Sequence, residues 1–379
     1  MGIFTRVNTY DTIIIGGGLA GLTAAIHLTQ KNHRVLVFEK QEYPNHKVCG
    51  EYVSNEIIPY LNTLGVTLPN AVDIDTLQFS TIQGNSITAK LPLGGKGISR
   101  YAFDYLLYTK ALDLKVTFVF EGVNTIKFDT DVFNITTDSG VKFSSKTAIG
   151  AYGKRSNLDK ALKRNFIEKK SSWLGVKAHY LLPDFPENFV ALHNFRGGYG
   201  GLSKTETGVV NFCYLVNYKS FKSEKDIQNF NTKVVSENPF LHAFLKEAIP
   251  IFEQPLSIAQ ISFQQKEAVA HHMLMCGDSA GLIHPLCGNG MAMAIHSAKI
   301  ASELLTTYLS TPEPNRKLLE TAYKKQWNKA FRHRLWIGRK LQWLLLHDKL
   351  SNITMKLVAR SPKLLQLLIK QTHGKPITC

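Results

Sequence analysis

A glycine-rich turn near the N-terminus constrains the fold more than any other feature. The run Thr12–Ile15 is apolar and rich in β-branched residues, which indicates a buried parallel strand. It leads directly into the sequence GGGLAG, in which Gly16, Gly18 and Gly21 have the spacing G-x-G-x-x-G. An apolar helix is expected over residues 22–28. This order of strand, turn and helix predicts the first half of a Rossmann-type unit.

The next expected strand ends in an acidic residue. Residues 34–38 form a second apolar run, and Glu39 follows it, 18 residues beyond Gly21. A carboxylate at this position can bind the ribose hydroxyls of a dinucleotide. The preceding helix offers free N–H groups and a positive dipole end to the phosphates, and the glycines let the backbone approach them closely. The combination predicts a dinucleotide site that includes Glu39.

A second segment with cofactor-binding character follows residue 270. The apolar run 273–276 leads into a Gly-Asp pair, a proline and further glycines, and then a helix that is expected to begin near Met291. An Asp at the end of this strand can accept a hydrogen bond from a ribityl hydroxyl, and the helix N-terminus can stabilise negative charge at a flavin. The residues expected to contact the cofactor here are Gly277, Asp278, Gly288, Gly290 and Met291.

The order of these segments resembles flavoproteins of the p-hydroxybenzoate hydroxylase type. Residues 277–302 are similar to the second FAD motif of that family, and residues 99–107 to its R-x-x-(F/L)-D-x-x-L helix. Residues 148–156 are similar to its GADGxxS segment. The resemblance spans about residues 10 to 310 and implies FAD as the cofactor, with Arg100 beside it.

The segment KVCGEYVS, residues 47–54, resembles the geranylgeranyl reductase-like branch of this superfamily. That branch has K-x-C-G-E-x-x-S beside the isoalloxazine ring, and a glycine where Gly281 stands here. The resemblance implies that Lys47 contacts the cofactor and that Cys49 is catalytic, whereas a lone Cys is otherwise usually a small buried apolar residue. His284, beside the second FAD motif, is a candidate proton donor, although a lone His in a loop is more often structural.

A glycine-rich stretch is expected to face the substrate. Residues 197–203 and 208–211 resemble the Y-x-W-x-(F/P) strand pair of the reductases, which makes Tyr199 and Gly201 candidate substrate contacts. Gly201 stands where that family has Trp, so a different substrate pocket is expected. A simple β-turn is the alternative interpretation of this stretch.

The resemblance implies an FAD-dependent oxidoreductase acting on an apolar isoprenoid, polyene or aromatic substrate, with reduction of a C=C bond by flavin hydride as the leading hypothesis. Two alternatives stay open: an FAD-dependent monooxygenase that hydroxylates or epoxidises its substrate, and a non-redox flavoprotein resembling lycopene cyclases. The electron donor is NAD(P)H or a reductase or ferredoxin. Tyr152 replaces an Asp that the family associates with pyridine-nucleotide use, which puts NAD(P)H in doubt. The chain lacks the W-x-W-x-I-P box of flavin-dependent halogenases.

The positive charge of the chain is concentrated at its C-terminal end. Residues 329–379 contain eleven Lys and Arg against the single Asp348, so they carry +10 of the formal +16. Because Leu and Trp are interleaved with these cations, they favour amphipathic helices at a membrane surface over a nucleic-acid site, and a solvated basic face is the other interpretation. The five scattered cysteines, the absence of a signal peptide and the absence of a long apolar run predict no metal and a cytoplasmic location, peripheral to the inner membrane face.

We therefore expect an α/β protein in which a Rossmann-type FAD-binding domain is interleaved with an antiparallel-sheet substrate domain and followed by a helical C-terminal cap. The alternating runs 76–80 and 209–214 indicate the antiparallel sheet. The expected boundaries are 8–70, 97–160 and 255–310 for the FAD-binding domain, 71–96 and 161–254 for the substrate domain, and 311–379 for the basic helical region.

Overall fold

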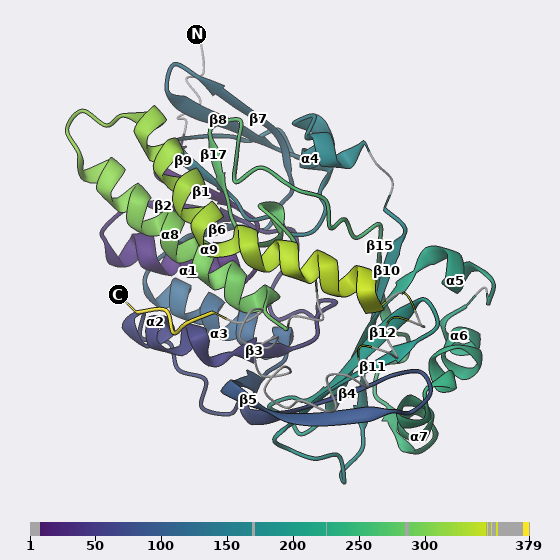
Figure 1. The fold of residues 1–379 in the computed structure, drawn as a ribbon. Coiled ribbons are helices and arrows are strands. Elements are labelled where there is room, and N and C mark those ends of the chain that lie inside the picture. The colour runs from purple at the N-terminus through teal and green to yellow at the C-terminus, as the bar shows by residue number, and fades with distance from the viewer. Residues whose placement is uncertain are drawn as a thin grey trace.

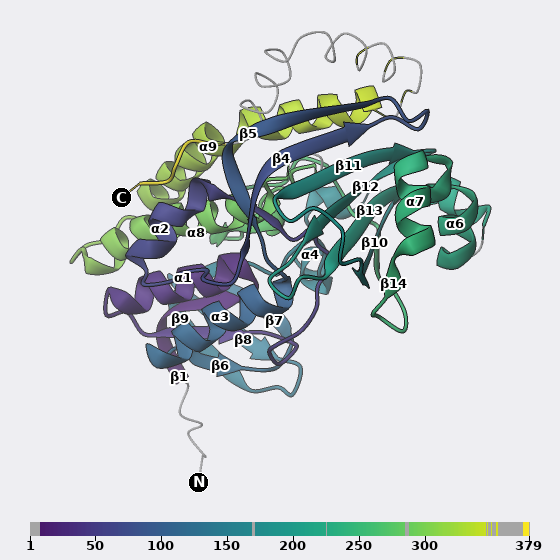
Figure 2. The ribbon, with the colours of Figure 1, turned by 90° about the horizontal axis from the view of Figure 1, so that it is seen from below.

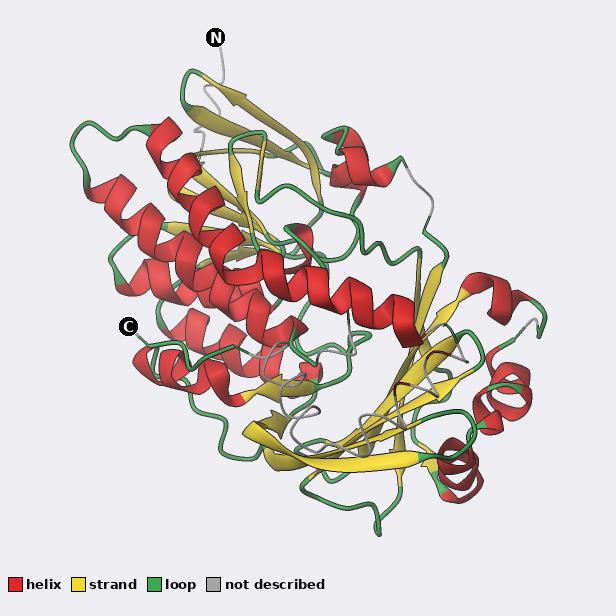
Figure 3. Cartoon of the chain, viewed as in Figure 1, coloured by secondary structure: helices red, strands yellow, loops and turns green. Residues whose placement is uncertain are grey.

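Two β-sheets organise the chain, one mainly parallel and one mainly antiparallel (Figure 1). The computed structural model describes residues 8–168, 171–224, 226–284, 288–345, 347, 350, 354 and 374–378. Long helices cover the first sheet, and three short helices flank the second (Figure 3). The predicted α/β fold class, with a Rossmann-type unit and a helical C-terminal region, is confirmed.

The first sheet has the strand order β16-β17-β9-β1-β2-β6, and the β7–β8 hairpin extends it beside β9. Five of its strands, β1, β2, β6, β9 and β17, run parallel, so their carboxyl ends meet at one edge. The apolar runs of β1 and β2 are buried because helices pack on the sheet. The strand bounds are β1 (Asn8–Ile15), β2 (Val35–Phe38), β6 (Thr117–Val119), β7 (Val123–Asp129), β8 (Val132–Thr137), β9 (Lys142–Gly150), β16 (Val269–Ala270) and β17 (Met273–Met275).

The helices around the first sheet pack in a connected group. Helix α1 contacts α3 and α8, and α8 in turn contacts α9. Ser99 caps α3 by accepting a hydrogen bond from the backbone N–H of Ala102. The helix bounds are α1 (Leu19–Gln30), α2 (Ile58–Thr63), α3 (Arg100–Asp113), α4 (Asn157–Ala161), α8 (Gly290–Ser310) and α9 (Arg316–Leu345).

The second sheet has the order β14-β10-β13-β12-β11-β4-β5-β3, with β15 beside β10. Its neighbours are antiparallel except β4 and β11, which pair in parallel. The prediction of an antiparallel sheet missed this pair because the two strands come from separate passes of the chain and no hairpin joins them. The strand bounds are β3 (Tyr52–Ser54), β4 (Val72–Ser80), β5 (Ser86–Gly97), β10 (Trp173–Leu181), β11 (Phe189–Phe195), β12 (Gly198–Lys204), β13 (Val210–Asn217), β14 (Ile249–Pro250) and β15 (Leu256–Ala259).

The chain crosses between the two sheets several times, as Figure 2 shows. Strands β3 and β15 belong to the second sheet, although they fall in the ranges predicted for the FAD-binding domain. The division into domains itself stays a prediction. Helices α5 (Tyr218–Lys222), α6 (Ile227–Lys233) and α7 (Pro239–Glu247) flank the second sheet, and Phe230, Leu241 and Phe244 of α6 and α7 belong to its apolar core.

The C-terminal part of the chain ties back to the first half. Helix α9 extends from the helices of the first sheet toward the second sheet (Figure 1). Residues 374–378 return to the body, where the backbone N–H of Ile377 donates to the carbonyl of Glu56 at 2.7 Å. The carboxylate of Glu56 also accepts a hydrogen bond from Arg334 at 3.3 Å. Among the described residues, no helix combines the length and the apolar character that crossing a membrane requires.

Candidate functional site

A cavity lies where the carboxyl edge of the first sheet faces the second sheet. Ten of the fifteen residues predicted for the site line it, and the other five surround it without lining it. The lining residues are Gly18, Cys49, Arg100, Tyr199, Gly201, Gly277, Asp278, Gly288, Gly290 and Met291. The other five are Gly16, Gly21, Glu39, Lys47 and His284.

The first glycine turn has the geometry that the spacing predicts. Gly16 has a φ of +106°, and a Cβ atom there would clash with the carbonyl of Ala151. A Cβ atom on Gly21 would clash with the carbonyl of Gly16, so a glycine is needed for α1 to start this close to β1. Gly18 is different, because its nearest neighbour would be Arg100 Nη2 at 3.4 Å. Its backbone therefore faces the cavity, where a phosphate can approach the N-terminus of α1.

Glu39 lies beside this turn. Its carboxylate accepts hydrogen bonds from the backbone N–H groups of Gly17 at 2.8 Å and Lys40 at 2.9 Å. The hydroxyl of Tyr43 donates to the carbonyl of Gly17. The acid predicted for the ribose is therefore held against the glycine turn, and its ribose contact stays a prediction.

A buried ion cluster stands at the start of α3. Arg100 forms two hydrogen bonds of 2.7 Å with the carboxylate of Asp104, and Lys47 contacts the same carboxylate at 3.0 Å. Burial by itself raises the pKa of Asp104, but the charges of Arg100 and Lys47 outweigh it, so the pKa lies below its usual range. Two cations against one carboxylate leave a net positive charge beside Gly18. This charge favours an anionic ligand such as a pyrophosphate.

The second motif brings another helix N-terminus to the same cavity. A 3-10 turn, Gly277–Ser279, follows β17, and Gly277 has a φ of +59°. Helix α8 begins at Gly290, and its first residues line the cavity together with the first residues of α1. Two positive helix ends and the Arg100 cluster therefore converge on one space. A glycine-lined turn, two helix N-termini and an excess of cations fit the anionic pyrophosphate of FAD.

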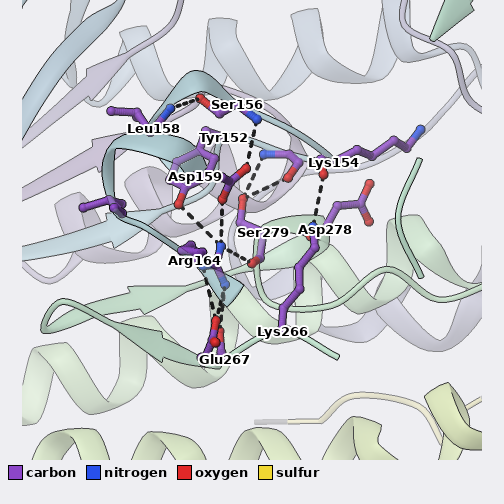
Figure 4. Close-up of polar contacts among 12 residues, drawn as sticks. Tyr152, Lys154, Ser156, Leu158, Asp159, Arg164, Lys266, Glu267, Asp278 and Ser279 are labelled. Carbon is purple, nitrogen blue, oxygen red and sulfur yellow. Dashed lines mark hydrogen bonds and ion pairs between the residues drawn. The ribbon is translucent and has the colours of Figure 1, made fainter. Parts of the chain in front are cut away.

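Two buried cations hold the Asp278 turn from behind (Figure 4). Lys266 donates to the carbonyl of Asp278 at 2.7 Å and to that of Lys154 at 3.1 Å. Burial lowers the pKa of Lys266 to about 8. Arg164 donates to the carbonyl of Ser279 at 2.9 Å and forms ion pairs with two acidic residues, Asp159 at 3.0 Å and Glu267 at 3.2 Å.

Sequence reasoning missed both of these cations. No motif contains Lys266 or Arg164, and the two cations reach the carbonyls of Asp278 and Ser279 only in the folded chain. Tyr152, which replaces the family's Asp, lies at the same place, with its hydroxyl 3.5 Å from Arg164 Nη1.

The segment that contains Cys49 is held in place by the fully buried carboxylate of Glu51. Glu51 has no exposed surface and accepts hydrogen bonds from Lys177 Nζ at 2.5 Å, from the Nε2 atom of His179 at 2.7 Å and from the backbone N–H of Arg100 at 2.7 Å. Burial by itself raises the pKa of Glu51, but the hydrogen bond from His179 and the charge of Lys177 outweigh it and lower the pKa. The backbone beside Glu51 is also held, because Asn211 donates to the carbonyl of Cys49 at 3.2 Å. Cys49 therefore has a defined position on the cavity wall.

His46, Glu51 and His179 also form a group whose potential ligand atoms lie within 4.8 Å of one another. Both oxygens of Glu51 already accept hydrogen bonds, one of them from a Lys. The positive charge of Lys177 at 2.5 Å opposes a cation at this place. The cluster is therefore an ion pair network and not a metal centre.

The second sheet supplies an apolar wall. Positions 199 and 201 lie on the same face of β12, because side chains alternate between the two faces of a strand. Their partners on β13 are Leu215 and Cys213, which line the cavity as well. Further lining residues from β4, β5 and β11 are Leu77, Leu91, Val190 and Leu192. A Cβ atom on Gly201 would have no neighbour closer than 3.4 Å, so the missing Trp leaves room there.

His284 does not belong to the cavity lining that includes Cys49 and Tyr199. His284 lies behind Tyr199, with its Nδ1 atom 3.3 Å from the Tyr199 hydroxyl, and its ring also packs on Phe263. Burial lowers the pKa of His284 to about 3, so the ring is uncharged near neutral pH. A neutral imidazole here can orient the hydroxyl of Tyr199, and the role of His284 as a proton donor stays a prediction.

Comparisons with known proteins agree with this geometry. Residues 14–46 match the family described as NAD(P)-binding Rossmann-like domain. The digeranylgeranylglycerophospholipid reductase of Methanosarcina acetivorans is 24% identical, with 86% of this chain and 82% of the relative covered. Among solved structures, the flavin-dependent brominase Bmp2 has a TM-score of 0.80 at 18% identity and covers 98% of this chain and 95% of its own. A geranylgeranyl bacteriochlorophyll reductase-like protein from Thermoplasma acidophilum has a TM-score of 0.75 at 18% identity, with 97% of both chains covered.

These similarities confirm the predicted resemblance to the geranylgeranyl reductase-like branch of FAD-dependent flavoproteins. They also confirm the coarser functional prediction, an FAD-dependent oxidoreductase. The structural neighbours include a reductase-like protein and a brominase, so a shared fold accommodates different reactions.

Proposed function

We propose that the protein is an FAD-dependent reductase that adds hydrogen across a C=C bond of an apolar isoprenoid or polyene. One observation supports this proposal most: the cavity that holds the FAD motifs is closed on its other side by the apolar face of the second sheet, with Cys49 on the wall between them. The sequence similarity to a digeranylgeranylglycerophospholipid reductase supports the same chemistry.

One wall of the cavity would bind the cofactor, and the other would bind the substrate. Gly18, the N-terminus of α1 and the Arg100 cluster would hold the pyrophosphate of FAD, and the turn at Asp278 with the N-terminus of α8 would hold the flavin end. When bound, reduced FAD supplies hydride transfer to the substrate. Tyr199, Gly201 and their apolar neighbours would bind the hydrocarbon and exclude water.

The proton that completes the reduction needs a donor within reach of the substrate. Cys49 and Tyr199 both line the cavity, and the hydroxyl of Tyr199 lies 3.3 Å from the Nδ1 atom of His284. We propose that one of these two groups delivers the proton. The electron donor is NAD(P)H or a reductase or ferredoxin, and Tyr152 in the place of the family's Asp favours the protein donors.

The test is a single turnover without oxygen. The FAD-loaded protein is photoreduced and mixed with a prenyl lipid or polyene, while the flavin absorbance and the mass of the product are followed. A reductase reoxidises its flavin and yields a product two mass units heavier than the substrate. A product that gains one oxygen atom only after air is admitted would instead show a monooxygenase, and a product isobaric with the substrate would show a cyclase-like enzyme.

Variants at the two proposed donors sharpen this test. Cys49→Ala and Tyr199→Phe both keep the size of the cavity nearly unchanged. We expect the variant that lacks the proton donor to slow product formation at least tenfold while FAD binding stays unchanged. If both variants turn over like the wild-type protein, the proton comes from another source.

A further inference from the structure

We propose that the outer face of α9 docks the protein on the surface of an anionic lipid bilayer. This outer face consists of the exposed residues Lys325, Lys329, Arg332, His333, Trp336, Arg339, Lys340 and Trp343. The proposal concerns a surface that the catalytic proposal does not use.

Helical periodicity separates α9 into two opposite faces. At 100° per residue, the eight residues of the outer face fall within about one third of a turn. The inner face is buried and packs on the core through Tyr323, Trp327, Phe331 and Leu335. The fold has therefore already used one apolar side of this helix, and the tryptophans on the other side have no role in the described core.

The charge of the outer face suits an anionic surface. Residues 321–345 contain seven Lys and Arg and no Asp or Glu. Five of these cations stand on the outer face, and the described part of the chain shows no ion pair for Lys325, Lys329, Arg332, Arg339 or Lys340. A Lys or Arg near an anionic lipid surface favours binding, and several of them act together.

The two tryptophans distinguish lipid from other anionic partners. Trp336 is 52% exposed and Trp343 is 56% exposed, and their spacing of seven residues places both on one line along the helix. Lys340 lies over the ring of Trp336 at 5.8 Å, so the cation and the indole form one amphipathic unit. Indole rings beside cations are typical of the boundary between headgroups and acyl chains. The helix would lie in the membrane plane with its inner face on the protein.

The outer face also borders a groove that shares one lining residue with the cofactor cavity. The groove lies between α9 and residues 264–269, and Arg332, Trp336 and Arg339 of the outer face line it. Leu282 lines both this groove and the cavity of the candidate site. We infer that an apolar substrate dissolved in the bilayer reaches the cavity along this groove, a step that rests on the proposed function.

The experiment measures vesicle binding of the FAD-loaded protein without any substrate. Sedimentation is compared for phosphatidylcholine vesicles and for vesicles with roughly one third phosphatidylserine at low salt. We expect strong preference for the anionic vesicles and a blue shift of tryptophan fluorescence on binding. The variant Lys329→Gln/Arg339→Gln removes two cations and should weaken binding about 25-fold, at roughly fivefold per charge. The variant Trp336→Ala/Trp343→Ala should weaken binding at least tenfold and abolish the blue shift.

Matched controls come from residues outside the outer face, on α3, β7 and β9 (Figure 2). Lys127→Gln/Lys142→Gln removes two exposed cations. Tyr105→Ala/Leu112→Ala removes two exposed side chains that are also seven residues apart on one helix, 47% and 45% exposed. Both controls should bind vesicles like the wild-type protein. All four variants change exposed residues and should keep their FAD content and melting temperature.

Three results would overturn the proposal. The first is equal binding to neutral and anionic vesicles, and the second is outer-face variants that bind like the controls. The third is displacement from vesicles by duplex DNA at equal phosphate concentration, with tryptophan variants that bind DNA normally, which would assign the face to nucleic acid. Vesicle binding does not depend on turnover, so the docking proposal can be supported even if the protein reduces no C=C bond. If the outer-face variants lose activity on a substrate in vesicles but keep it on the same substrate in detergent, this result supports the groove as the route of the substrate.

Discussion

Replacing Glu51 with Gln tests whether its buried ion network holds the Cys49 segment. The substitution keeps the size of the side chain but removes its charge, so Lys177 stays buried without a counter-ion and one of three donors faces an amide NH2 group. Breaking a buried ion pair by removing one partner costs about 3–5 kcal/mol. An unfolding entropy of about 2.1 cal/mol/K per residue is roughly 0.8 kcal/mol/K for 379 residues. The melting temperature of E51Q should therefore fall by about 4–6 °C.

The assay is thermal unfolding at saturating FAD, followed by far-UV circular dichroism. Asp75→Asn is the control, because it breaks a 2.7 Å ion pair with Lys90 in which both side chains are more than half exposed. Exposed pairs contribute about 0–1 kcal/mol, so this control should melt within about 1 °C of the wild-type protein. A melting temperature of E51Q that is equally close to the wild-type value would refute the view that the network is stabilising.

The wild-type protein and E51Q together also test the direction in which the pKa of Glu51 is shifted. The pKa of Glu51 is lowered in the folded state, so the carboxylate contributes stability above its unfolded pKa of about 4.3 and loses it as the pH falls through the folded value. The difference in melting temperature between wild-type and E51Q should be constant from pH 8 to about pH 5 and should shrink below that. A difference that widens in acid would contradict the assignment.

Three further predictions concern the cavity. Gly21→Ala places a methyl group against the carbonyl of Gly16, at a cost of about 1–3 kcal/mol, and should lower FAD affinity at least tenfold in a fluorescence titration. Lys266→Met removes the donor from two partly buried carbonyls and should raise the Kd for FAD about tenfold or more; an unchanged Kd would show that the Asp278 turn keeps its geometry without Lys266. Gly201→Trp should fill the substrate side and lower kcat/KM for a long polyene at least tenfold with normal FAD binding, whereas Gly201→Ala, whose methyl group meets nothing closer than 3.4 Å, should behave like the wild-type protein.

Much of the cofactor half could be predicted from the sequence because its signals are local. The strand, the turn at Gly16 to Gly21, the helix and Glu39 after β2 follow one another closely in the sequence. Gly16 is required by its positive φ, and Gly21 is required by the close approach of the Gly16 carbonyl. The second motif at Gly277 and the helix that begins at Gly290 are equally local. The strands and the helix of these motifs lie where the patterns indicated.

The polar interior was not predictable in the same way. Glu51 meets Lys177 and His179 across 126 and 128 residues, and Lys266 meets Asp278 only because β16 and β17 form a tight hairpin behind the turn. Glu51 pairs with Lys177 and His179 because the folded chain brings distant segments together, and a single residue carries no signal of its distant partner. The parallel pairing of β4 with β11 was missed for the same reason.

The sequence by itself determined the cofactor class, the Rossmann unit and most of the segments that line the candidate cofactor cavity. Only the tertiary structure decided that His284 lies behind Tyr199 and is uncharged, that a buried carboxylate fastens the Cys49 segment, and that α9 turns its tryptophans and cations outward. The physical reason is that burial and pairing depend on what packs against each face of an element. A periodic pattern shows that a helix has two faces, but the fold decides which of them the core covers.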